Sequence, residues 1–143
     1  MKTKFILWIG VLFLLLIAGG CEKDTPSELL GTWKLIGFGN LEGNIVTEAE
    51  PKDCLECYTI TFQKDGILTG FTATNATYGK YNVQGKQIKI ERFSIKTLVN
   101  ELFDGPRFVE DVRKVTRYEI VSKQLRLYYN EDKDYLLLKK EQQ

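Results

Sequence analysis

Short segments in which apolar and polar side chains alternate cover most of the chain after residue 31. In one of them Tyr58, Ile60 and Phe62 project to one side and Thr59 and Thr61 to the other, as in a strand with one buried face. About eight segments have this character, namely 32–38, 57–62, 67–74, 79–83, 87–95, 115–121, 124–130 and 134–140. Turn-forming residues separate them at hairpin spacing, as in a barrel or a sandwich. We expect a mainly β fold, a small antiparallel β-barrel of about eight strands.

One segment between strands five and six departs from this alternation. After Asp104-Gly105-Pro106, the residues Phe108, Val109 and Val112 recur at helical spacing and predict one short helix over 107–114. We expect this helix to pack over one end of the barrel. The preceding segment, 97–103, is compatible with either a loop or an extension of the helix.

The N-terminus predicts export and a membrane anchor. Residues 1–4 are basic and residues 5–18 carry no charge, so 1–20 reads as a signal peptide rather than an uncleaved anchor helix. Residues 17–21 resemble the lipobox of bacterial lipoproteins, with Ala18 where that family usually has Leu. The resemblance implies lipid on Cys21, which becomes the link to the membrane.

The segment that follows defines a short tether. Residues 21–24, Cys-Glu-Lys-Asp, resemble the signal with which some Gram-negative lipoproteins reach the cell surface. This implies an outer-membrane lipoprotein of the cell envelope that can be exposed at the surface. Thr25-Pro26-Ser27-Glu28 is a capping box and predicts a short helical turn near residue 31. Residues 21–25 are therefore the lipidated tether, and 26–143 form a single domain.

Charge and composition exclude several classes of function. Removing residues 1–20 takes away two of the 20 basic side chains, leaving 18 basic against 19 acidic side chains. The net charge of the mature chain is close to zero, which argues against a nucleic-acid partner. We also expect a monomer. The chain contains no histidine, which excludes Ser-His and Cys-His catalysis and histidine zinc sites. We expect no enzyme activity, no metal and no cofactor. The alternatives are glycoside hydrolysis by two carboxylates placed across a sugar cleft, and calcium binding at 130–134.

The pair Cys54 and Cys57 has the C-x-x-C spacing of redox centres. It lies at the end of a polar loop rather than at the start of a helix, and Asp53 and Glu56 would raise the thiol pKa values. Outside the cytoplasm we expect the two cysteines to form a disulfide that holds the entry to the strand at 57–62. A redox role and two free thiols are the alternatives.

A set of glycine, asparagine and aromatic positions resembles the META/HslJ-like domain, a small bacterial β domain common in lipoproteins. The matching residues are Gly31, Trp33, Gly70, Asn75, Gly79 and Tyr81. Thr74 replaces a cysteine of the family motif, and Asn100 and Glu101 stand near the position of the second one. The order of strands is also similar to lipocalin-like proteins, which is the alternative.

These motif positions have physical roles of their own. We expect Asn75 and Gly79 to bracket a tight turn, because both residue types tolerate positive φ. We expect Trp33 and Tyr81 to fill the barrel core. Such residues identify a fold rather than a chemistry.

The most direct functional hypothesis is non-enzymatic binding of an unidentified small ligand or envelope protein. The exposed contact residues are predicted to be Tyr78, Tyr128 and Tyr129. One alternative is an inhibitor that presents the loop 39–53 to a hydrolase. Another is a structural or assembly lipoprotein.

Overall fold

The computed structural model describes residues 24–97 and 99–142, which form nine strands and one helix. Their bounds are β1 Gly31–Asn40, β2 Ile45–Glu48, β3 Thr59–Phe62, β4 Ile67–Phe71, β5 Ala76–Gln84, β6 Gln87–Ile95, α1 Gly105–Lys114, β7 Arg117–Val121, β8 Gln124–Tyr129 and β9 Asp134–Lys140. The predicted signal peptide and the lipidation site Cys21 lie outside the described residues. The helix that the described residues form, α1, is not long and apolar enough to cross a membrane.

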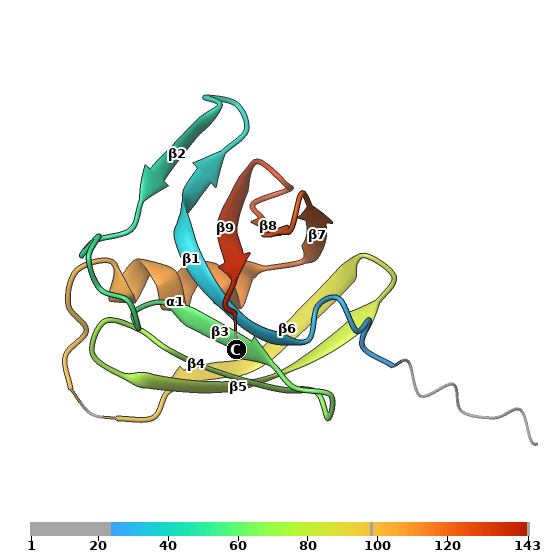
Figure 1. The fold of residues 1–143 in the computed structure, drawn as a ribbon, viewed down its shortest axis with the longest axis horizontal. Coiled ribbons are helices and arrows are strands. Elements are labelled where there is room, and N and C mark those ends of the chain that lie inside the picture. Colours follow the sequence, from blue (N-terminus) through green and yellow to red (C-terminus); the bar gives the residue numbers. More distant parts are fainter. Residues whose placement is uncertain (1–23, 98, 143) are drawn as a thin grey trace, which may run out of the picture.

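Eight of the strands close into a ring. The antiparallel order runs β1-β3-β4-β5-β6-β7-β8-β9, and β9 pairs back with β1 (Figure 1). This confirms the mainly β barrel and the position of the helix between β6 and β7. The ninth strand, β2, pairs with the second half of β1 and lies outside the ring. The sequence prediction treated 39–53 as a loop, whereas β1 and β2 form a hairpin there.

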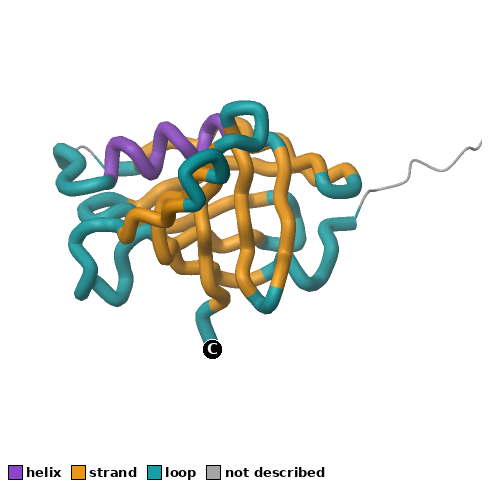
Figure 2. Tube along the Cα trace, turned by 90° about the horizontal axis from the view of Figure 1, so that it is seen from above, coloured by secondary structure: helices purple, strands orange, loops and turns teal. Residues whose placement is uncertain are grey.

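The ring is weakest between β6 and β7, and the helix lies at this joint. A single residue pair, Gln87 with Arg117, joins the two strands. The side chains of Phe108 and Val112 on α1 are buried in the core, and Figure 2 shows the helix lying over the strands. Residues 97 and 99–103 are not part of the helix, because α1 begins at Gly105.

Large side chains fill the interior of the barrel. Trp33 and Tyr81 are buried, as predicted. The Trp33 indole donates a hydrogen bond to the Leu29 carbonyl at 2.8 Å, and the Tyr81 hydroxyl donates to the Gln63 carbonyl at 2.5 Å. These bonds satisfy the polar atoms that each ring carries into the core. The predicted N-terminal turn spans 27–29 and is closed by the Leu29 amide, which donates to the Pro26 carbonyl.

Strand register separates the loops into two ends. Thr59 pairs with Phe71, Phe71 with Ala76, and Thr77 with Ile95, so the loops beside these residues share one end. We call it the loop end, formed by residues 49–58, 72–75, 96–97 and 99–104. The start of β1 pairs with the end of β3 instead, which places residues 24–30 at the opposite end (Figure 1).

Gly79 does not belong to a turn. It lies within β5, where the register with β6 shifts between Tyr78 and Lys80, and the extra residue is on β6. A Cβ on Gly79 would lie 3.0 Å from the Phe93 Cα. The prediction that Asn75 and Gly79 bracket a turn is wrong, because close strand approach, not positive φ, requires this glycine.

Candidate functional site

Asn75 is a buried clamp at the loop end. It is 3% exposed and immediately precedes β5. Its side-chain amide donates to the Val99 carbonyl at 2.9 Å and to the Glu101 carboxylate at 2.5 Å, and its oxygen accepts a bond from the Thr97 hydroxyl. Asn75 therefore holds the segment between β6 and α1 against the segment between β4 and β5.

Glu101 completes the clamp from the opposite loop. Its carboxylate accepts hydrogen bonds from the hydroxyls of Thr72 at 2.9 Å and Thr74 at 3.1 Å. Thr74 and the neighbourhood of Glu101 are the places where the META/HslJ resemblance aligns two cysteines. In this chain, hydrogen bonds to the Glu101 carboxylate connect the segment between β4 and β5 to the segment between β6 and α1.

The predicted disulfide joins Cys54 and Cys57, whose Cα atoms are 5.5 Å apart. The Lys34 ammonium donates to the carbonyls of both residues, at 2.8 and 2.6 Å. Burial lowers the pKa of Lys34 from its ordinary value. The disulfide and the lysine together hold the cysteine loop against β1.

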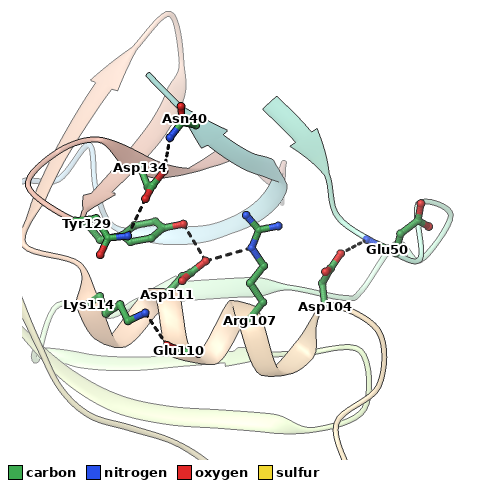
Figure 3. A network of polar contacts seen from close by, with 10 residues as sticks. Asn40, Glu50, Asp104, Arg107, Glu110, Asp111, Lys114, Tyr129 and Asp134 are labelled. Carbon is green, nitrogen blue, oxygen red and sulfur yellow. Dashed lines mark hydrogen bonds and ion pairs between the residues drawn. The ribbon is translucent and has the colours of Figure 1, made fainter. Parts of the chain in front are cut away.

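Tyr58 connects the cysteine loop to the start of α1. Its hydroxyl donates to the Glu50 carbonyl at 2.5 Å and accepts a bond from the Asp104 amide at 3.1 Å. Burial raises the pKa of Tyr58 to about 12, so the hydroxyl stays protonated at neutral pH. The Glu50 amide in turn donates to the Asp104 carboxylate at 2.8 Å (Figure 3).

These held segments present apolar side chains to solvent. Leu55, between the two cysteines, is 83% exposed, and Phe103, just before α1, is 65% exposed. Phe71, Val99 and Leu102 are also exposed. Four of the five belong to loops, while Phe71 is the last residue of β4. Apolar side chains exposed on loops that are held in place are typical of a contact surface rather than of a packing defect.

A second polar network lies under the β1–β2 hairpin. The Asp111 carboxylate, on the buried side of α1, accepts a hydrogen bond from the Tyr129 hydroxyl at 2.9 Å and lies 3.5 Å from the Arg107 guanidinium (Figure 3). The same guanidinium lies 3.8 Å from the centre of the Phe38 ring. Burial raises the pKa of Asp111, and burial followed by the bond to Asp111 raises the pKa of Tyr129.

Tyr129→Phe is expected to lower the free energy of unfolding by about 1–3 kcal/mol, because the buried Asp111 carboxylate loses a donor. In an Asp111→Asn background the same change should cost less, since a neutral amide is easier to leave with fewer partners. Urea unfolding of the four proteins at neutral pH measures the difference. Equal costs in both backgrounds would show that the bond contributes nothing.

The raised pKa of Asp111 also sets the sign of a pH effect. The folded protein holds this proton more tightly than the unfolded chain, so the contribution of Asp111 to stability falls as pH rises through the window between the two pKa values. Asp111→Asn should lack this part of the pH dependence.

A groove of about 550 Å³ opens between β2 and the start of α1. Its lining residues are Val46, Thr47, Glu48, Glu50, Lys52, Asp104 and Arg107. Both apolar and charged side chains therefore face the groove. β2 forms one wall, and the half-exposed Arg107 stands on the other.

The predicted contact tyrosines are not a common exposed surface. Tyr129 points into the core and Tyr128 lies on the outer face, but each is only 3% exposed. The Tyr128 ring is covered by Tyr135 and by the Arg117 guanidinium, which lies 3.9 Å from its centre. Tyr78 is half-buried, with the Lys96 ammonium 4.7 Å from its ring centre. Alternation indicates which face a residue occupies, but not whether another side chain covers that face.

Across 24–97 and 99–142, no group of three or more His, Cys, Asp or Glu side chains is placed to hold a metal ion. Two of the acids in the segment 130–134 have protein partners, and the Asp132 carboxylate lies 2.8 Å from the Arg117 guanidinium. The Asp134 carboxylate accepts hydrogen bonds from the amides of Asn40 and Asn130, both at 2.7 Å (Figure 3). Protein donors therefore occupy both oxygens of this carboxylate.

The fold and the site define a closed antiparallel barrel that presents apolar side chains on clamped loops. No family model matches the chain. A protein of Tannerella forsythia named "Putative lipoprotein" is 28% identical over 148 residues, which cover 97% of this chain and 97% of that protein.

Two solved structures are similar in fold, each with a TM-score of 0.63. One is a DUF4847 family protein from Bacteroides vulgatus, 18% identical, covering 82% of this chain and 96% of that one. The other is a protein from Burkholderia xenovorans, 14% identical, covering 80% of this chain and 85% of that one. The comparisons support the barrel fold and not the narrower META/HslJ family.

Proposed function

We propose that this chain is an outer-membrane lipoprotein, anchored by lipid on Cys21, that binds another envelope protein with its loop end and catalyses no reaction. The lipobox-like segment and the relative named as a lipoprotein, aligned over nearly the whole chain, support the anchor. The observation that carries the binding role is the exposure of apolar side chains on loops held by buried polar bonds and a disulfide.

The packed interior favours a protein partner over a small ligand inside the barrel. Rings and aliphatic side chains, among them Trp33, Tyr58, Phe62, Phe108 and Tyr118, are fully buried in the barrel and beneath α1. Pockets for small ligands are mostly concave and enclose most of the ligand surface. The exposed apolar residues near the loop end, such as Leu55 and Phe103, instead lie on connecting segments, which suit contact with another protein surface.

The position of the tether supports the same orientation. Residues 24–30 lie at the end opposite the loop end. At about 3.3 Å per extended residue, a tether over 21–25 keeps that opposite end close to the membrane. The loop end then points away from the membrane, where another envelope protein can reach it.

Site-specific photocrosslinking in intact envelopes tests this proposal. A photoreactive phenylalanine analogue replaces Phe103 at the loop end or, as the matched control, Lys64, which is exposed in the turn between β3 and β4 at the opposite end. We expect a discrete adduct with one protein from position 103 and none from position 64, identified by mass spectrometry.

Adducts from position 64 alone, or from neither position, would contradict binding by the loop end. The same cells test the anchor separately, because Cys21→Ser should release the protein from the membrane fraction. Membrane retention of a Cys21→Ser protein whose mass shows that residues 1–20 have been removed would contradict lipid attachment without bearing on the loop end.

A further inference from the structure

β2 is a strand with one unpaired edge. It pairs antiparallel with β1 from Gly37 opposite Glu48 to Asn40 opposite Ile45, and it is the terminal strand of the sheet. Figure 1 shows the β1–β2 hairpin projecting beyond the closed ring. The edge away from β1 therefore has no strand partner among the described residues.

The hydrogen bonds of β1 determine which atoms of β2 point to this edge. The Leu41 amide donates to the Lys133 carbonyl on the β9 side. Because successive backbone amides of a strand alternate in direction, the amide of Asn40 points toward β2 and pairs with Ile45. The backbone N–H and C=O groups of Val46 and Glu48 then point away from β1, to the unpaired edge.

The exposed edge is short, because β2 has four residues, but it has none of the other features that usually prevent strand addition. All four residues of β2 are exposed, and Ile45, Val46 and Thr47 are uncharged residues that favour strands. Natural edge strands are commonly protected by lysine, proline, a bulge or a covering element. In β2 the first charge comes at its last residue, Glu48, so the edge is open to another strand.

Charge around the edge indicates the chemistry of that strand. In the groove beside β2, Lys52 is paired with Glu48 at 3.2 Å and Arg107 with the buried Asp111. The carboxylates of Glu50 and Asp104 have no cationic partner among the described residues. The groove is therefore net negative and is complementary to a basic segment.

We propose that β2 binds an extended, basic segment of a protein partner as an added strand, whose apolar residues alternate with Lys or Arg. The Val46 and Glu48 backbone groups would hydrogen-bond this segment, and Glu50 and Asp104 would attract its cations. The inference rests on the proposed partner-binding function. It concerns the backbone edge of β2, and the two carboxylates that it adds, Glu50 and Asp104, lie in two of the segments that form the loop end.

Val46→Pro is the variant that tests the backbone contact. It removes the N–H that points to the unpaired edge and leaves the β1–β2 bonds in place, since proline is tolerated on edge strands. Val46→Thr is the matched control, because it keeps the N–H and a β-branched side chain. Equal thermal unfolding of the two variants shows that the barrel, whose ring does not include β2, is intact in both.

The probe is a short peptide that alternates valine and lysine, compared with the same peptide carrying glutamate for lysine. Fluorescence anisotropy measures affinity, and amide NMR shifts of labelled protein locate the contact. We expect the lysine peptide to bind with shifts at Val46 and Glu48, and roughly tenfold weaker binding by Val46→Pro, the effect of one lost hydrogen bond. Val46→Thr should bind unchanged, and the glutamate peptide should bind at least about tenfold more weakly.

Equal binding by Val46→Pro, equal affinity for the two peptides, absent binding, or shifts confined to the loop end would each overturn the proposal. Dimerisation of the protein in the absence of peptide would also overturn the proposal if Val46→Pro abolished it. The strand added to β2 would then come from a second copy of this chain. Val46 and Phe103 lie in different segments of the chain. Peptide binding that Val46→Pro does not weaken would contradict the added strand alone, and a missing crosslink from Phe103 would contradict binding by the apolar loop residues alone.

Discussion

Asn75→Asp is expected to lower the free energy of unfolding at neutral pH by about 3–5 kcal/mol, the cost of an uncompensated buried charge. The native amide donates to the Glu101 carboxylate at 2.5 Å and to the Val99 carbonyl at 2.9 Å. An aspartate of the same shape loses both donors and places a second carboxylate beside the first. Chemical denaturation of the wild type and the variant measures the difference.

The pH dependence and a second substitution separate this charge effect from a simple loss of packing. Two adjacent carboxylates raise the pKa of one of them in the folded state, so the stability of Asn75→Asp should fall as pH rises from about 4 to 7. Adding Glu101→Gln to this variant should recover part of the loss, because the new glutamine amide can donate to the introduced aspartate. A loss that is the same at both pH values and unaffected by Glu101→Gln would contradict the clamp.

Gly70→Ala is expected to lower the free energy of unfolding by about 3 kcal/mol, near the upper range for overpacking. A Cβ at this position would overlap the Thr59 carbonyl oxygen in the neighbouring strand β3. Backbone atoms cannot rotate away as a side chain can, so β3 and β4 must separate locally. Thermal or urea unfolding of the variant measures the loss.

Gly79→Ala is the matched control for this substitution. There the nearest atom to a new Cβ is the Phe93 Cα at 3.0 Å, and the bulge on β6 gives that segment room to adjust. We expect a smaller loss, about 1 kcal/mol. Equal losses from both substitutions would contradict the distinction between a backbone overlap and a tight contact.

Both predictions concern residues that carry the family resemblance, and both assign them structural roles. Gly70 and Gly79 allow neighbouring strands to approach, and Asn75 connects two loops. Partner recognition is instead proposed for side chains that no motif includes, such as Phe103 and Val46. The positions that determine the barrel and those proposed to contact other molecules are therefore separate in this chain.

The strands of the ring could be predicted from the sequence because one face of each is buried. Alternation at Tyr58, Ile60 and Phe62 directly reflects the packed core. β2 could not be predicted in this way, since all four of its residues are exposed and the sequence there carries no buried face. Its strand conformation depends on pairing with β1, which is a tertiary contact.

The candidate site was predictable only in part. The spacing of Cys54 and Cys57 together with the predicted export predicted the disulfide, whereas the spacing alone also fits a redox centre or two free thiols. The partner of Asn75 could not be predicted, since Glu101 is 26 residues away and its approach depends on the register of β5 and β6. For the same reason the burial of Tyr128 beneath Arg117 was missed.

The mainly β class, the positions of the ring strands along the chain, the single helix and the disulfide between the two nearby cysteines could be inferred from the sequence alone. These features follow from local periodicity, turn residues and short cysteine spacing, which all depend on residues that are close together in the sequence. Tertiary contacts determine which apolar residues stay exposed, which loops share an end and which strand edge stays unpaired. Those properties depend on contacts between segments far apart in the chain, and ring closure with its strand register brings such segments together.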